Sequence, residues 1–176
     1  LGVDSENTSL AFTQKWINDI SLNYDAVDVL TMKAGSTYQL NKNVNLFFIN
    51  DQNTNYTKIY QLRKLNKLTR KLIKNNNYTH CFAHMAPMQH LVAKFYLIQK
   101  NIKTTLWFTH SGPKFGIKWL ILWFSSLLAN NIVTASKHSF PFRFKKVKSI
   151  GHGINFDNFF IERKTFQLKN ISILSR

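Results

Sequence analysis

The amino-acid sequence predicts an α/β fold in which a parallel sheet is flanked by helices. Short apolar segments of strand length alternate along the chain with longer segments in which apolar residues recur every three or four positions. Strands that are separated by helical crossovers pair in parallel, because the crossover returns the chain to the end where the previous strand began. Hydrophobic residues make up 44% of the 176 residues, which is enough for one sizeable core. We therefore expect one globular domain over most of the chain.

The first half of the chain contains two expected helices and two expected strands. A first helix, ending near Asn23, is predicted by apolar residues that recur every four positions: Phe12, Trp16 and Ile20. Strands are expected at 27–32 and 44–49, and a second helix at 57–74. One half of that second helix is apolar, and the other half carries six cations: Arg63, Lys64, Lys67, Arg70, Lys71 and Lys74.

The second half of the chain repeats the alternation of strand and helix. The expected elements are, in order, a strand at 80–84, a helix that Pro87 opens, a strand at 104–109, a helix at about 115–129, and strands at 131–135 and 147–150. A last apolar segment at 171–175 has strand character and follows a charged stretch. We expect it to open a second domain.

The charge of the chain is strongly positive and unevenly distributed. The formal net charge is +16, and the stretch between Asp51 and Asp157 contains 17 Lys and Arg but no Asp or Glu. A field of this size favours an anionic partner, such as nucleic acid, phospholipid or a phosphorylated substrate. AT-rich codon usage also enriches Lys and Asn, so the basicity has a second explanation that does not involve function.

Membrane-spanning and disulfide-rich classes do not fit the sequence. The longest uncharged apolar run, at 119–129, is 11 residues long, whereas a spanning helix needs about 20. The N-terminal residues Leu1 to Glu6 contain neither an initiating Met nor the basic-then-apolar pattern of a signal peptide, so we expect this end to be a cut edge. With Cys81 as the single cysteine, no intrachain disulfide can form. A cytoplasmic location is expected, and Cys81 is interpreted as a buried, inert thiol.

Polar residues follow the expected strands at the points where those strands end. His84, His110, Ser136 and His152 each lie at or just beyond the carboxyl end of a strand. In parallel α/β sheets, ligands bind outside these ends, where loops and helix N-termini converge. The pattern therefore predicts a binding edge. The competing interpretation is that His and Ser are common there as turn formers and helix caps.

Several segments around these residues resemble one enzyme family. The segments are HMAP at 84–87, WFTH at 107–110, VTASKHSF at 133–140 and KVKSIGHGI at 146–154. In their order and separation they are similar to the N-terminal domain of family 4 glycosyltransferases of the GT-B fold. The opening DSEN at 4–7 resembles the first loop of that group, and the closing ISILSR at 171–176 resembles the first strand of its donor domain.

The resemblance implies a retaining glycosyltransferase built from two Rossmann-like domains. Residues 1–165 would form the acceptor-side domain, which lacks its first strand here, and 166–176 would begin a truncated donor domain. The implied co-substrate is a nucleotide sugar, the acceptor is a glycan or a lipid-linked glycan of the cell envelope, and neither a metal nor another cofactor is expected. A fragment of this extent would be inactive alone. Where the family has an acid after Gly-Ile, this chain has Asn155.

The resemblance also implies roles for individual residues. His110 matches the catalytic histidine that faces the transferred sugar, while Arg176 and Gly153 match donor-binding positions, Arg176 being the arginine that neutralises the donor diphosphate. The residues expected to line the cleft or meet the acceptor are His84, Lys114, Ser136, His138 and His152.

Two helices are candidates for contact with a membrane. The cationic half of the helix at 57–74 suits peripheral attachment to the anionic inner face of the plasma membrane. The alternative interpretation is that this half is an ordinary surface in contact with water. The helix around Trp119 and Trp123 is apolar nearly all round, so it is either buried in the core or partly in lipid.

Other functions remain open from the sequence. A non-catalytic basic α/β domain could bind nucleic acid or an anionic surface, although no RNP-like aromatic motif is present and Arg is scarce. A zinc site at His80 and His84 is not expected, because the segment reads as a strand and no third ligand has suitable spacing. A Ser-His-acid triad between residues 52 and 156 is excluded, since that stretch has no acid.

Overall fold

The computed structural model describes residues 2–3, 11–35, 40–50, 56–110, 112, 115–136 and 138–151 of the chain. Its elements are, in order, β1 (Gly2–Val3), α1 (Ala11–Ser21), β2 (Val27–Thr31), β3 (Lys33–Ala34), β4 (Val44–Phe48), α2 (Lys58–Asn75), β5 (His80–His84), α3 (Pro87–Gln99), β6 (Lys103–Trp107), α4 (Ile117–Leu128), β7 (Asn131–Thr134) and β8 (Val147–Ser149). The segments at 152–176, which include the expected strand at 171–175, lie outside the described residues.

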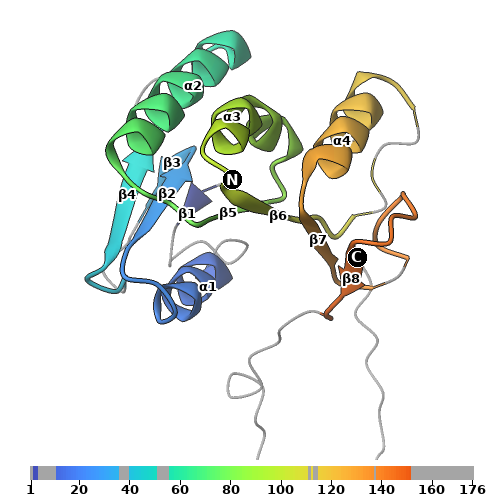
Figure 1. Ribbon diagram of the computed structural model, residues 1–176, viewed down its shortest axis with the longest axis horizontal. Coiled ribbons are helices and arrows are strands. Elements are labelled where there is room, and N and C mark those ends of the chain that lie inside the picture. The colour runs from blue at the N-terminus through green and yellow to red at the C-terminus, as the bar shows by residue number, and fades with distance from the viewer. Residues whose placement is uncertain are drawn as a thin grey trace, which may run out of the picture.

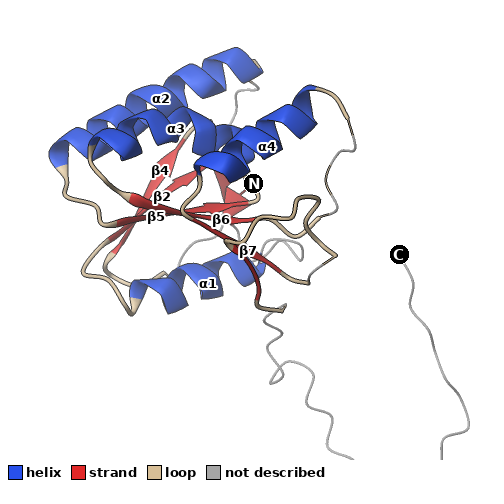
Figure 2. Cartoon of the chain, turned by 45° about the vertical axis from the view of Figure 1, so that its right-hand side comes forward, coloured by secondary structure: helices blue, strands red, loops and turns tan. Residues whose placement is uncertain are grey.

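The strands form three parallel sheets that lie in one layer between helices (Figures 1 and 2). The largest sheet has the order β5-β6-β7-β8, and two-stranded sheets pair β2 with β4 and β1 with β3. Helices α2, α3 and α4 cover one face of this layer, while α1 lies on the other (Figure 2). The structure confirms the predicted α/β class and its parallel pairing.

Two short strands and several element ends differ from the sequence prediction. The pair of β1 and β3 was not predicted, because a two-residue strand shows no periodicity. Strand β6 covers Lys103–Trp107, one residue earlier at its start and two earlier at its end than the predicted 104–109. Trp107 is the last residue of β6 in the ladder, where it pairs with His84 of β5 and with Val133 of β7. Residues 108 and 109 lie beyond this last pair.

The second helix, α2, forms where the capping and spacing signals place it. The Thr57 hydroxyl oxygen accepts a hydrogen bond from the Tyr60 N–H at 3.4 Å, and a Thr at this position supplies an acceptor for the first turn. The helix ends at Asn75, and the N–H of the capping residue Asn76 donates to the Leu72 carbonyl at 3.0 Å. Its buried side consists of Leu65, Thr69, Leu72 and Ile73.

The main core lies between the large sheet and α4. Ala83, Leu106 and Ile132 are neighbours in register across β5, β6 and β7, and all three are buried against Leu122 of α4. Successive residues of a strand point to opposite faces. The next residues along, His84 and Trp107, therefore face α1 instead.

The helix α4 is buried on one side only. Leu122, Ser125 and Ser126 are its buried residues, whereas several of its leucines and Phe124 are exposed. Deep burial in the core, one of the two alternatives expected for this helix, is wrong for the described residues, because α4 lies at one end of the helix layer. One flank of α4 packs on α3 and the sheet, and its outward side meets no described element.

Candidate functional site at the carboxyl edge of the sheet

The carboxyl ends of β5, β6 and β7 meet at one edge of the sheet. The register pairs His84 with Trp107, and Trp107 with Val133. Since all these strands are parallel, the chain leaves each of them at the same edge. His84 is the last residue of β5, His110 lies three residues beyond β6, and Ser136 lies two residues beyond β7. These three polar residues are therefore at the same edge of the sheet.

The imidazole of His84 is enclosed by aromatic rings on the α1 face of the sheet. The Trp16 ring meets it edge-on at 5.3 Å between centroids, and the Phe12 ring does so at 6.0 Å. Trp16 also contacts Trp107 at 4.9 Å. Burial lowers the pKa of His84 below the ordinary histidine value. The residue is a neutral part of an aromatic wall rather than a free acid or base.

His110 is an exposed histidine of this edge. Its ring meets the Phe108 ring edge-on at 6.3 Å, and Phe108 belongs to the core beneath α4 together with Phe140. Among the described residues no ring contact joins His110 to His84. The two histidines thus share the edge of the sheet, but His84 is held under α1 while His110 is open to solvent.

Met85 connects the loops that follow β5 and β6. Its N–H donates to the Trp107 carbonyl at 2.9 Å, which extends the ladder by one residue beyond the strand. Its Sδ accepts a hydrogen bond from the Thr109 N–H at 3.4 Å. Met85 has a φ of 52°, a left-handed conformation that is uncommon for a residue with a side chain. This conformation could not be predicted from the sequence, because Met has no preference for it.

Two helices begin at this edge without a side-chain cap. Helix α3 starts at Pro87 after Ala86, and α4 starts after Gly116, which has a φ of 91°. Neither capping residue supplies a hydrogen-bond acceptor from its side chain. The first N–H groups of such helices and the positive end of the helix dipole favour an anion. The edge is therefore electrostatically suited to a phosphorylated ligand.

Ser136 takes part in a turn at the end of β7. Its Oγ lies 2.6 Å from the Oγ of Ser139, and the Ser139 N–H donates to the Ser136 carbonyl at 3.0 Å. His138 lies within this turn and is exposed. These bonds fit the role of a turn former, and they leave Ser136 at the surface of the edge. Lys114, His152, Gly153 and Arg176, which were also predicted to line the site or bind the donor, lie outside the described residues, as does Asn155.

The sequence interpretation did not identify a group of buried polar residues at the opposite end of the sheet, where β6 and β7 begin. On α3, His90 and Lys94 face the core, where the Lys94 ammonium donates to Thr104 Oγ1 at 3.1 Å and to Asn130 Oδ1 at 3.4 Å. Burial lowers the pKa of Lys94. The sequence offered no signal for them, because the apolar residues Leu91, Phe95 and Ile98 fall on a different side of the helix from His90 and Lys94.

The lone thiol, Cys81, is partly buried near this group. Burial raises the pKa of Cys81 to about 11, so the thiol stays protonated and unreactive at neutral pH. This agrees with its interpretation as an inert core residue. The group of buried polar residues joins α3 to the start of β6 and to Asn130, the residue before β7.

The part of the chain that the structure describes contains no cluster of metal ligands and no membrane-spanning helix. There, no three His, Cys, Asp or Glu residues gather as metal ligands would, and no helix is both long and apolar enough to cross a bilayer. Comparison of the chain with protein-family models gives no match, and comparison with curated proteins gives none either.

Proposed function

We propose that this chain is the acceptor-side domain of a retaining glycosyltransferase of the GT-B type. One observation carries the proposal. Three residues from the segments that resemble this family, His84, His110 and Ser136, follow neighbouring parallel strands and share one edge of the sheet. Two uncapped helix N-termini begin at the same edge, which favours an anionic ligand such as a nucleotide sugar.

In the proposed reaction, the bond between the anomeric carbon and the donor phosphate breaks, and an acceptor hydroxyl oxygen takes the place of that phosphate. The nucleoside diphosphate leaves with the bonding electron pair, and the hydroxyl proton passes to it or to solvent. His110 is exposed and held by Phe108, so its imidazole can donate a hydrogen bond to the sugar as charge develops. His84 is neutral and enclosed, and its part is to shape the wall of the site.

The experiment compares His110→Ala with His80→Ala in the full-length polypeptide that contains this chain. His80 is exposed at the opposite end of β5, which makes it a matched control. Transfer of a labelled sugar from a panel of UDP- and GDP-sugars to lipid and glycan acceptors is measured. We expect His110→Ala to lower kcat by about 100-fold, or about 3 kcal/mol, with an unchanged unfolding midpoint. Equal activity of the two variants, or no transfer from any donor by the unaltered protein, would overturn the proposal.

A further inference from the structure

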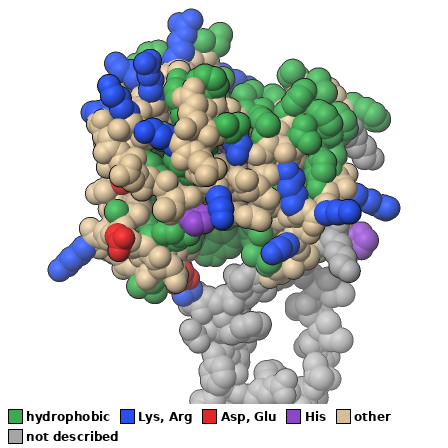
Figure 3. All heavy atoms as spheres, in the orientation of Figure 1, with side chains coloured by type: hydrophobic (Ala, Val, Ile, Leu, Met, Phe, Trp, Pro, Cys, Tyr) green, Lys and Arg blue, Asp and Glu red, His purple; other side chains and the backbone are tan. Residues whose placement is uncertain are grey.

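The outward side of the helix layer divides into a cationic part and an apolar part. Helices α2, α3 and α4 lie side by side over the same face of the sheet (Figure 1). Each has one side buried toward the sheet and an opposite side turned outward. In the space-filling view, Lys and Arg gather over α2 and hydrophobic side chains gather over α4 (Figure 3).

The apolar part is a continuous stripe along α4. Ile117, Leu120, Phe124 and Leu127 are spaced by three or four residues, which places them on one side of the helix. That side is opposite Leu122 and Ser125, which face the core. Ile117 is 70% exposed and Phe124 is 47% exposed. A contiguous exposed apolar stripe of this kind indicates a contact surface, whereas exposed apolar residues without such a role are usually scattered singly over a protein.

The two tryptophans of this helix are not part of the stripe. The Trp119 ring packs edge-on against Phe142 at 5.3 Å, and Trp123 stacks parallel to Trp119 at 6.5 Å. Both are half-buried. The part of this helix that can meet a lipid surface is therefore the side with Leu120 and Phe124, which face outward, and not the side with the two tryptophans.

The cationic part is the outward side of α2. Arg63, Lys67, Arg70, Lys71 and Lys74 are exposed, and Lys64 is half-buried with its ammonium 5.6 Å from the Tyr56 ring centroid. The sequence has no Asp or Glu between Asp51 and Asp157. No carboxylate of the three helices can therefore neutralise these cations, and the whole layer presents one sign of charge.

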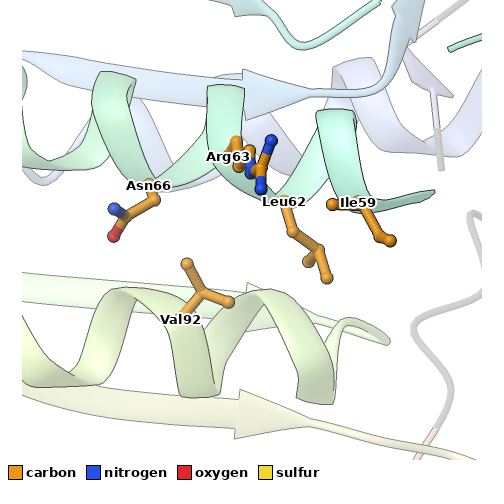
Figure 4. Close-up of a pocket in the computed structure, with 5 residues that line it drawn as sticks. All are labelled: Ile59, Leu62, Arg63, Asn66 and Val92. Atoms are coloured by element: carbon orange, nitrogen blue, oxygen red, sulfur yellow. The ribbon is translucent and has the colours of Figure 1, made fainter. Parts of the chain in front are cut away.

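The middle of the layer also has exposed apolar groups. Phe95 on α3 is 64% exposed. A groove of about 370 Å³ runs between α2 and α3, lined by Ile59, Leu62, Arg63, Asn66 and Val92. Figure 4 shows Leu62 and Val92 approaching from the two helices, with the Arg63 guanidinium close by on α2. Apolar walls beside a cation suit a molecule that has both an apolar chain and an anionic head.

We propose that the outward side of α2, α3 and α4 binds the surface of an anionic lipid membrane. The stripe on α4 enters the interface between headgroups and acyl chains, and the cations of α2 contact lipid phosphates. Charge complementarity selects this occupant. A second copy of the chain would bring one net charge of +16 against another, which opposes association through this surface. The inference does not depend on the proposed transferase activity.

The test is co-sedimentation of the protein with vesicles of phosphatidylcholine alone and with vesicles that contain phosphatidylglycerol, at low and high salt. The apolar variant is Leu120→Gln with Phe124→Gln, and its control is Leu22→Gln, an exposed leucine next to α1 on the other face. The cationic variant is Lys67→Gln with Lys71→Gln. Its control, Lys15→Gln with Lys42→Gln, removes the same charge near α1.

We expect phosphatidylglycerol to strengthen binding by about tenfold or more at low salt, and high salt to remove most of that gain. The apolar variant should lose binding at both salt concentrations, and the cationic variant should lose the preference for phosphatidylglycerol. Both controls should bind within about twofold of the unaltered protein. Circular dichroism checks that every variant is folded.

Four results would overturn the inference. One is equal loss of binding in the variants and in their controls, and another is binding that is indifferent to phosphatidylglycerol. The third is a self-association, seen by sedimentation velocity without lipid, that the apolar variant abolishes, because the stripe would then be an interface between copies. A gel shift with RNA in the absence of any vesicle binding would likewise assign the cations to nucleic acid.

Discussion

The Nδ1 atom of His90 lies 2.8 Å from the Oγ of Ser125, and this hydrogen bond joins α3 to α4 inside the core. Both residues are buried. Burial, with the ammonium groups of Lys94 and Lys146 nearby, lowers the pKa of His90 to about 4 from a reference value of 6.5. The folded protein therefore holds His90 neutral at every pH near neutrality.

We expect this histidine to make the protein less stable as the pH falls. Between pH 6.5 and pH 4 the unfolded chain binds a proton that folded His90 does not, so the free energy of unfolding decreases with decreasing pH. Between pH 7.5 and pH 5 the loss is about 2 kcal/mol. Urea unfolding at the two pH values measures it. His90→Gln should remove most of this dependence, while the exposed His80→Gln should retain it. A pH response that His90→Gln leaves intact contradicts the assignment.

The buried ammonium of Lys94 predicts an unequal response to two substitutions. Lys94→Met removes a charge from the core, and Asn130 Oδ1 still accepts from the Thr104 N–H at 2.9 Å, so stability should change by less than about 1 kcal/mol. Asn130→Ala removes the acceptor shared by Lys94 and Thr104 and should cost about 2 kcal/mol. Thermal and urea unfolding compare the two. A larger loss for Lys94→Met would show that the lysine stabilises the fold.

The ring of Trp16 controls the environment of His84. Trp16→Ala should expose His84, raise its pKa toward the ordinary value and destabilise the fold by about 2–3 kcal/mol. An NMR titration of the histidine side chains measures the pKa. The matched control is Tyr24→Ala, because Tyr24 meets His80 at 5.9 Å at the other end of β5. An unchanged pKa of His84 in Trp16→Ala would mean that Trp16 does not shield it.

Lys146 closes the C-terminal end of α4. Its ammonium donates to the carbonyls of Leu127 and Ala129 at 2.7 and 2.6 Å, where the helix leaves carbonyl groups without partners in the helix. Lys146→Ala should cost about 1–2 kcal/mol of stability, as judged by urea unfolding. Its neighbour Lys145 is exposed, and Lys145→Ala should change stability by less than about 0.5 kcal/mol. Similar losses in both would point to total charge rather than to the cap.

The sequence predicted elements wherever periodicity was strong. It placed β5 at the residues where the structure has it, and it placed α2 within one residue at each end. The surroundings of His84 could not be predicted, because Trp16 is far away in the sequence and only the packing of α1 under the sheet brings the rings together. The buried side of helix α4 could not be predicted for a different reason. It buries Ser125 and Ser126 and exposes leucines, so hydrophobicity alone assigns its sides wrongly.

The order of strands in the large sheet has a consequence for how the chain is made. The spatial order β5-β6-β7-β8 is also the order along the chain. During synthesis, β6, β7 and β8 each leave the ribosome after the strand on which they dock is already present. This half of the protein can therefore grow strand by strand without waiting for a distant segment. In contrast, β2 must wait for β4.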